Sequence, residues 1–108
     1  MNVNFQEGGT GYSALHYAVL NNDKRLANLL VKNYVDVRVQ DANLQNPVHL
    51  ACIKGNTELF KELINACYQA KESIDKHKKT PLDYARDNGN IEMIDYVKKT
   101  TNMLFNIE

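Results

Sequence analysis

The amino-acid sequence predicts an all-α solenoid of three helix-turn-helix repeats linked by β-hairpin loops. The first observation is self-similarity, because residues 13–18, 46–51 and 80–85 align at a spacing of 33 and then 34 residues. The second is a helix-capping residue at the start of each aligned segment. The third is an apolar pattern with helical spacing after each segment. Such a period is the signature of repeat proteins, in which each unit stacks on its neighbours.

Each repeat should begin with a short inner helix. Ser13, Asn46 and Thr80 are suited to cap a helix, because their side-chain oxygens accept a hydrogen bond from an unpaired backbone N–H. Pro47 and Pro81 follow at the first helical position, where the missing N–H costs nothing. The inner helices are therefore expected near 13–21, 46–54 and 80–88.

A longer outer helix should follow each inner helix. Asn22, Gly55 and Gly89 stand at the polar breaks, and these residue types tolerate the left-handed backbone that ends a helix. Apolar residues then recur at spacings of three and four, which places them on one face of a helix. The outer helices are expected near 23–32, 57–68 and 91–99.

The chain should form a single domain over 1–108. Its parts are the end of a truncated preceding repeat (1–10), repeat one (11–40), repeat two (41–74), repeat three (75–99) and a tail (100–108). Val3 and Asn4 fit the end of a repeat whose helices are not in the sequence, so we expect the chain to be a fragment of a longer protein. The apolar tail either folds back as a cap on the last outer helix or frays.

The aligned segments resemble the ankyrin repeat, whose signature is T-P-L-H-x-A. Residues 80–85 read TPLDYA and residues 46–51 read NPVHLA, and the resemblance extends over nearly the whole chain. It implies a stack that binds other proteins through a concave surface made of hairpin tips and inner helices. It also implies a non-catalytic chain.

The first repeat resembles the IκB family, the inhibitors of Rel/NF-κB transcription factors, and the ankyrin portions of NF-κB precursors. Residues 3–19 read VNFQEGGTGYSALHYAV, close to that family's V-N-x-Q-E-x-x-x-G-x-T-A-L-H-x-A-V. The hairpin is one residue longer than in the next repeat, as in the family. The resemblance implies binding of a Rel homology dimer and a cytoplasmic location with shuttling to the nucleus. The alternative is an ankyrin adaptor within an unrelated multidomain protein or a viral or bacterial effector.

Composition argues against other classes of partner. Lys plus Arg and Asp plus Glu both number 13, so the formal net charge is zero. A general nucleic-acid binder normally shows a basic excess, and no apolar run approaches the roughly 18 residues of a membrane span. We therefore expect neither a nucleic acid nor a membrane as partner. Cys52 and Cys67 are expected to be reduced thiols.

No catalytic, cofactor or metal constellation is predicted. His16 and His49 share one repeat position, which favours a structural role between neighbouring hairpins over chemistry. The run 76–79, KHKK, is interpreted first as a solvated turn and second as a basic tip that meets an acidic partner. A third interpretation is a nuclear-localisation or nucleic-acid patch.

The variable positions of the expected concave surface are the candidate partner-binding residues. Leu20 and Ile53 are apolar one repeat apart, and Tyr12 is expected to be an exposed anchor beside them. Replacing Tyr12 and Ile53 by Ala should then weaken binding and leave the fold intact. The full set is Thr10, Tyr12, Leu20, Asn21, Ala42, Asn43, Gln45, Ile53, Lys54, Lys76, His77, Lys79, Asp87 and Asn88.

Overall fold

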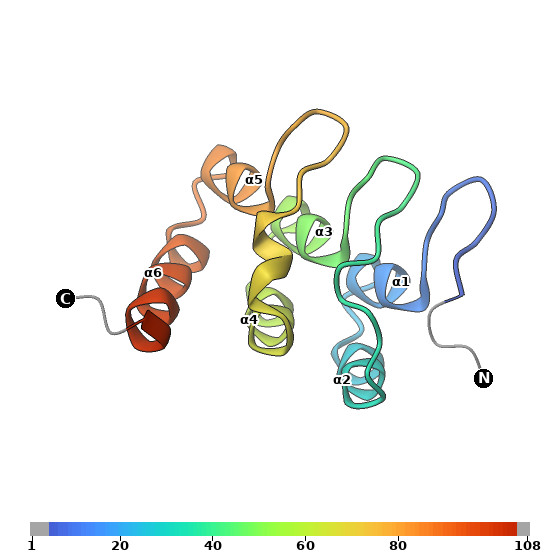
Figure 1. The fold of residues 1–108 in the computed structure, drawn as a ribbon, viewed down its shortest axis with the longest axis horizontal. Coiled ribbons are helices and arrows are strands. Elements are labelled where there is room, and N and C mark those ends of the chain that lie inside the picture. The colour runs from blue at the N-terminus through green and yellow to red at the C-terminus, as the bar shows by residue number, and fades with distance from the viewer. Residues whose placement is uncertain (1–4, 106–108) are drawn as a thin grey trace.

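The computed structural model describes residues 5–105, with side chains through Thr101, and it confirms the all-α stack. The inner helices are α1 (Ala14–Leu20), α3 (Pro47–Lys54) and α5 (Pro81–Asp87). The outer helices are α2 (Lys24–Lys32), α4 (Thr57–Ala66) and α6 (Ile91–Phe105). Figure 1 shows these two rows side by side, with one long loop rising before each inner helix.

Capping starts the inner helices where the sequence predicts. Ser13, Asn46 and Thr80 are the N-caps, and each side chain accepts a hydrogen bond from the backbone N–H three residues later. That third residue is His16, His49 or Asp83, and its side chain accepts the N-cap's own N–H in return. Each inner helix therefore begins with two otherwise unpaired donors satisfied.

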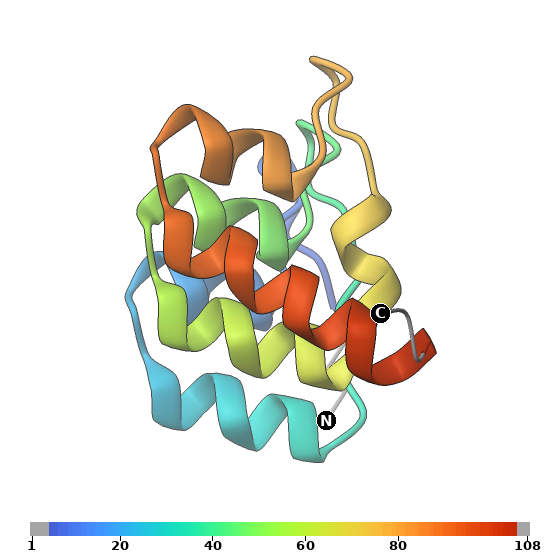
Figure 2. The same ribbon diagram turned by 90° about the vertical axis from the view of Figure 1, so that its left-hand side faces the viewer.

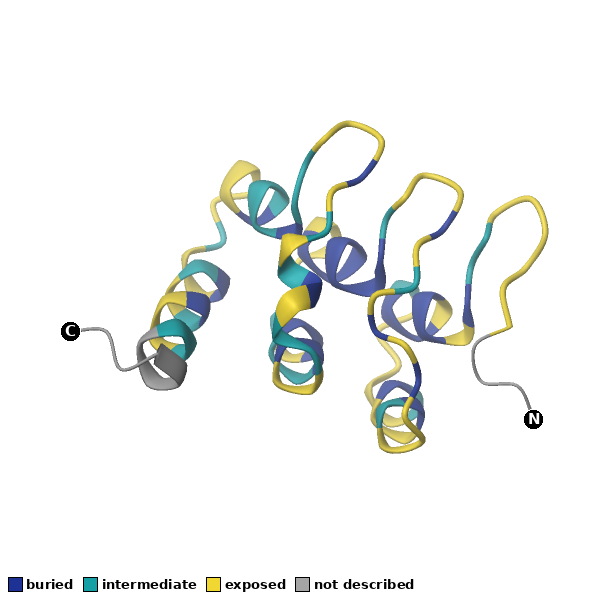
Figure 3. Ribbon diagram, in the orientation of Figure 1, coloured by how far each residue is buried: buried dark blue, intermediate teal, exposed yellow. Residues whose placement is uncertain are grey.

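The core lies between the two rows of helices and between successive repeats. Ala18, Ala51 and Ala85 are fully buried, so small side chains face the outer helices where the rows meet. The large side chains Phe60 and Met93 fill the same layer from the outer row and are also fully buried. Figure 3 shows the buried residues facing this layer, with exposed residues on the loops and on the outer helices' far side.

The predicted hairpins are tight loops without strands in the described part of the chain. One isolated bridge pairs Gln6 with Ser13. Backbone hydrogen bonds close each tip, among them Glu7 N to Tyr12 O at 2.8 Å, Asp41 N to Gln45 O at 2.9 Å and Asp75 N to Lys79 O at 3.0 Å. The first of these loops encloses one residue more than the other two, as its sequence indicates. Figure 2 shows the loops projecting beyond the inner helices.

Several boundaries differ from the predictions. Helix α4 ends at Ala66 because Cys67 has an extended backbone, and a 3₁₀ helix that the sequence did not predict, η1 (Tyr68–Glu72), follows it. Helix α6 continues through Phe105, so the first part of the predicted tail extends the last outer helix. Residues 106–108 lie outside the described residues, as do Val3 and Asn4, on which the truncated-repeat prediction rests.

The left-handed turn positions explain how each inner helix ends. Asn22, Gly55 and Gly89 have φ of 53°, 74° and 66°, which confirms their predicted role. Tyr34 follows the first outer helix with φ of 61° and a 93% exposed side chain. A residue with a Cβ pays a conformational cost in this region, so Tyr34 is a strained position.

Candidate partner-binding surface

The three loop tips are held to one another by backbone hydrogen bonds. Ala42 N donates to Thr10 O at 2.9 Å, and Lys76 N donates to Asn43 O at 3.1 Å. These bonds link consecutive tips along the stack, as the adjacent loops in Figure 1 indicate. We call the loop tips, together with the exposed sides of α1, α3 and α5, the inner face. Its backbone is therefore fixed before any partner arrives.

Two histidines tie the first two inner helices, α1 and α3, each to the next loop. His16 Nε2 lies 2.8 Å from Gln45 O, and His49 Nε2 lies 2.9 Å from Lys79 O. The Nδ1 atoms accept from the backbone N–H groups of Ser13 and Asn46, so the Nε2 atoms carry the protons and donate. Both side chains are fully buried, and burial lowers the pKa of each imidazole. The predicted structural role of both histidines is confirmed.

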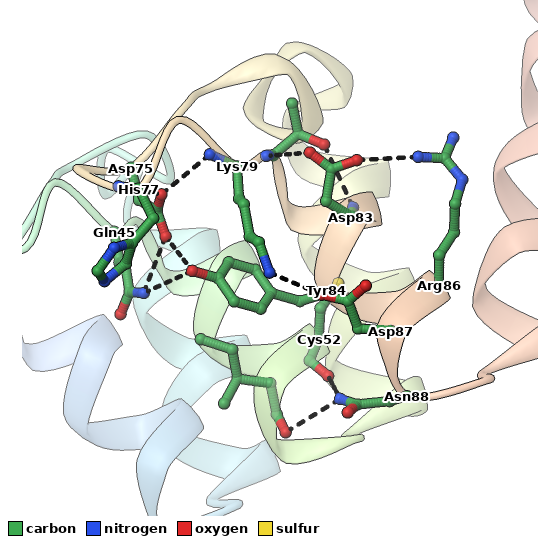
Figure 4. A network of polar contacts seen from close by, with 12 residues as sticks. Gln45, Cys52, Asp75, His77, Lys79, Asp83, Tyr84, Arg86, Asp87 and Asn88 are labelled. Atoms are coloured by element: carbon green, nitrogen blue, oxygen red, sulfur yellow. Dashed lines mark hydrogen bonds and ion pairs between the residues drawn. The ribbon is translucent and has the colours of Figure 1, made fainter.

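A polar network fixes the third loop to the second repeat. Figure 4 shows Gln45, Asp75 and Tyr84 pointing toward one another. Asp75 accepts from the Tyr84 hydroxyl, from Gln45 Nε2 at 3.1 Å and from the backbone N–H groups of His77 and Lys79. Burial by itself raises the pKa of Asp75, but these hydrogen bonds hold that pKa well below its usual range. The Asp75 carboxylate is therefore held in its charged form by the hydrogen bonds that it accepts within the turn.

Most of the predicted binding residues are exposed on the inner face. The exposed members are Thr10, Asn21, Ala42, Asn43, Ile53, Lys54, Lys76, His77, Asp87 and Asn88. The half-buried members are Tyr12, Leu20, Gln45 and Lys79. The half-buried side chains pack against neighbouring residues and present less area to a partner than the exposed group does.

Tyr12 is not the exposed anchor that the sequence suggested. Its ring stacks on His16 with 5.6 Å between centroids and meets Tyr17 edge-on at 5.2 Å. The side chain is half-buried because it covers the buried imidazole. Replacing Tyr12 together with Ile53 would therefore disturb packing as well as the surface, and Ile53 alone is the cleaner test.

Gln45 and Lys79 also have partners within the chain. Gln45 donates to Asp75, as described above. Lys79 Nζ lies 2.8 Å from Asp87 Oδ2 and 5.1 Å from the centre of the Tyr84 ring. Their functional groups are engaged at the base of the third loop, which leaves the tips beside them to meet a partner.

Two exposed tip residues were missed by the sequence mapping. Leu44 is 46% exposed, and Lys78 is exposed at the equivalent position of the next loop. Both have φ of 61°, where the first loop has Gly11 at 72°. The shared left-handed backbone turns these side chains outward. Their place one residue before Gln45 and Lys79 was the available signal.

A cleft opens between the ends of α3 and α5, beside the inner face. It measures about 520 Å³, and Ile53, Lys54, Asn88 and Ile91 are among its lining residues. Asn88 Nδ2 donates to Cys52 O at 3.1 Å, as Figure 4 shows, and to Ile53 O at 3.4 Å, so these bonds join the end of α5 to α3 beside the cleft. The Ile53 and Ile91 side chains are 39% and 64% exposed. The cleft therefore offers apolar surface beside the Lys54 side chain, which makes no ion pair within the described residues.

The described residues contain little that could hold a metal ion or act as a reactive thiol. Among them, no group of three or more His, Cys, Asp or Glu side chains converges on a possible metal position. Cys52 and Cys67 are free thiols, and burial raises the pKa of Cys52 to about 12, which keeps it protonated and unreactive. No helix in the described part of the chain has the length and hydropathy needed to cross a membrane.

These features define a repeat stack that presents a rigid, side-chain-rich surface. Residues 15–104 match the family described as ankyrin repeats (three copies), and the chain belongs to this family. Ankyrin repeats are a non-catalytic fold that binds other proteins, which agrees with the sequence-based expectation that the chain is not an enzyme.

Three relatives show the contexts in which similar stacks occur. The chain is 34% identical over 93 residues to the SMC5-SMC6 complex localization factor protein 1 of Bos taurus, covering 84% of this chain and 9% of that protein. The Homo sapiens protein of the same name is 34% identical over 84 residues, covering 77% and 8%. The putative ankyrin repeat protein FPV223 of Fowlpox virus is 29% identical over 94 residues, covering 87% and 64%. The chain thus spans less than two thirds of each relative.

Proposed function

We propose that the chain is an adaptor that binds a partner protein through the inner face, with Ile53 and the α3–α5 cleft as its apolar centre. The carrying observation is that exposed side chains stand on a backbone already locked from loop to loop. A preformed surface loses little conformational entropy on binding, so more of the contact energy appears as affinity. Apolar side chains within a polar rim are the usual anatomy of a protein interface.

The relatives support the adaptor role over a free-standing function. In the bovine and human proteins, the similar segment makes up less than a tenth of a long chain named as a localization factor. A short repeat stack that forms a small part of a long chain is suited to supply a contact surface for another protein. The viral relative, named as a putative ankyrin repeat protein, is compatible with the same role.

A Rel homology dimer is the second candidate partner, with the cytoplasmic location and nuclear shuttling that such a role implies. One observation favours it: the first loop is longer by one residue, closed by the Glu7–Tyr12 bond, as the IκB-like pattern of residues 3–19 requires. The Tyr17 hydroxyl donates to Glu7 Oε1 at 2.7 Å and braces that loop. The relatives named above carry other names, so this candidate stands on the first repeat alone.

The location of the binding surface is tested by selecting displayed short peptides of random sequence on the immobilised chain. Enriched peptides are then titrated against Ile53→Arg and against the matched control Leu29→Arg. Leu29 is also an exposed aliphatic residue, 57% exposed, but it lies on outer helix α2. The proposal expects Ile53→Arg to abolish binding and Leu29→Arg to preserve it. The reverse pattern, or no enrichment on the folded chain, contradicts it.

The Rel candidate has its own test. The chain is titrated with a purified Rel homology dimer, and saturable binding that Ile53→Arg abolishes supports it. A folded chain that selects peptides on the inner face but does not bind the dimer leaves the adaptor role and removes the Rel partner.

A further inference from the structure

The third loop tip differs in charge from the two tips beside it. The second tip carries Ala42, Asn43 and Leu44 after its Asp, whereas the third carries Lys76, His77 and Lys78 at the same positions. The two tips are neighbours because Lys76 N donates to Asn43 O at 3.1 Å. The lysines therefore flank an uncharged tip on a rigid frame.

The charges on the inner face do not balance locally, although the whole chain is neutral. Within the described residues, no ion pair involves Lys54, Lys76 or Lys78, and all three side chains are exposed. The carboxylates of α5 are already engaged, since Asp83 pairs with Arg86 and Asp87 pairs with Lys79. The carboxylate of Asp75 in the third loop is buried and accepts hydrogen bonds from Gln45 and Tyr84, so it makes no ion pair with the exposed lysines.

The first repeat has the opposite character. Its loop carries one charged side chain in the described residues, Glu7, which accepts from Thr10 and Tyr17 at 2.7 Å each. The outer row is balanced by pairs between repeats, such as Lys24 with Glu58 at 2.6 Å. The exposed lysines without an ion pair among the described inner-face residues thus lie on repeats two and three and not on the first loop.

The third tip contains a left-handed backbone position at Lys78. Lys78 has φ of 61°, a conformation that glycine adopts without cost and that Gly11 adopts at the equivalent place in the first loop. Leu44 has the same φ in the second tip, so the two tips share this backbone and differ in the charge that they display.

We propose that the third loop and the α3–α5 cleft together bind an acidic segment of the partner protein, whose carboxylates face Lys76, Lys78 and Lys54 and whose apolar side chain enters the cleft at Ile53. Complementary charges raise the association rate and select the partner, while the cleft supplies the apolar contact. This inference rests on the proposed function, because it names the partner chemistry of the same face. An acidic protein segment fits better than a nucleic acid, since Lys54 lines the apolar cleft together with Ile53 and the chain as a whole carries no basic excess.

The experiment uses the random-peptide selection on three proteins in parallel. They are the unaltered chain, Lys76→Glu/Lys78→Glu, and the matched control Lys98→Glu/Lys99→Glu on outer helix α6, which changes the net charge equally. The unaltered chain and the control are expected to enrich peptides rich in Asp and Glu around an apolar residue. The Lys76→Glu/Lys78→Glu variant is expected to bind these peptides on the order of tenfold more weakly or worse, because each exposed ion pair is replaced by a repulsion.

Two further measurements are the salt dependence of peptide binding and the binding of an RNA oligonucleotide. Raising the ionic strength from about 0.05 M to about 0.3 M shortens the screening length and should weaken peptide binding to the unaltered chain several-fold. Enriched peptides without an acidic bias, or equal affinity for the unaltered chain and for Lys76→Glu/Lys78→Glu, overturn the inference. In either case, peptide binding that still depends on Ile53 preserves the proposed function. Tighter, Lys76- and Lys78-dependent binding of a single-stranded RNA oligonucleotide also overturns it. If circular dichroism shows that the Glu variant is unfolded, Lys76→Gln/Lys78→Gln replaces it under the same criteria.

Discussion

The middle repeat and the last repeat use similar residues at equivalent positions but bury them to different extents. Phe60 in α4 is fully buried, whereas Ile94, its counterpart in α6, is only partly buried. Val48 in α3 is likewise fully buried, and its counterpart Leu82 in α5 is only partly buried. The middle repeat is covered on both sides, and among the described residues the last has a neighbour on one side alone.

The difference shows that a repeat's core is completed by its neighbour and not by its own sequence. In a stack, stability is close to a sum of repeat terms and nearest-neighbour interface terms. Equivalent substitutions should therefore cost more in the middle repeat than in the last. The same logic places the strongest constraints on the residues that join repeats, above all the histidines.

The largest expected effect is from Phe60→Ala. Removing a fully buried aromatic side chain from the middle repeat should destabilise the fold by about 3–5 kcal/mol. The counterpart Ile94→Ala should cost about 1 kcal/mol, because that side chain is only partly buried. Urea denaturation followed by circular dichroism measures both, and equal costs would break the comparison between the two repeats.

His49→Gln should cost about 1–3 kcal/mol, because the bond from Nε2 to Lys79 O is lost or weakened inside the stack. Burial lowers the pKa of His16 and His49, so the folded chain binds fewer protons than the unfolded chain just below the ordinary histidine pKa of about 6.5. The histidine contribution to stability is therefore fully present above that pH and is lost as the pH falls through the folded pKa. Urea melts at several pH values should show this decline, and a smaller one in His49→Gln.

An undiminished pH dependence in His49→Gln/His16→Gln would contradict the role of the buried imidazoles. The last repeat provides an internal contrast, because it has Asp83 at this position. Hydrogen bonds at the Thr80 cap lower the pKa of Asp83, so its contribution is present above the ordinary carboxylate pKa and is lost only in more acidic solution.

Tyr12→Ala should cost about 1 kcal/mol, the worth of the aromatic contacts with His16 and Tyr17. Ile53→Ala should change the free energy of unfolding by no more than about 0.5 kcal/mol, since its exposed side chain contributes little to the core. Thermal melts of the two single variants distinguish a side chain that stabilises the fold, Tyr12, from one that is exposed on the inner face, Ile53. A larger loss for Ile53 than for Tyr12 would reverse the assignment.

The last predicted effect is a gain in stability. Tyr34→Gly should stabilise the chain by about 0.5–1 kcal/mol, because glycine relieves the left-handed strain and the ring is almost fully exposed. The matched change Gly55→Ala adds that strain at φ of 74°, with open space around the new Cβ, and should cost about 1 kcal/mol. A destabilised Tyr34→Gly in the same melts would show that the ring makes contacts of value.

The repeating elements were predictable from sequence because each depends on local chemistry. Ser13, Asn46 and Thr80 cap helices wherever they precede such a segment, and Gly55 and Gly89 end them. The extension of α6 and the 3₁₀ turn η1 were missed because no cap or glycine marks them. The fit of the first repeat to an IκB-like pattern remains a prediction about partner and location.

Repeat alignment predicted where the candidate surface lies, but not which of its side chains contact other residues of the chain. Repeat alignment predicted exposed side chains at Ala42, Asn43 and Ile53, and all three are exposed. It could not show that Tyr12 covers His16 or that Gln45 and Lys79 are engaged by Asp75 and Asp87, because those contacts join residues from different elements. It also passed over Leu44 and Lys78, whose exposure follows from a left-handed backbone that non-glycine residues seldom adopt.

The most direct test of the central claim is a map of backbone amide chemical shifts as a selected peptide is titrated into the labelled chain. Binding at the inner face predicts changes at residues 42–45, 52–54 and 76–79, with the amides of outer helix α2 unmoved. Changes centred on α2 or along the outer surface of α6, with the loop tips undisturbed, would contradict it.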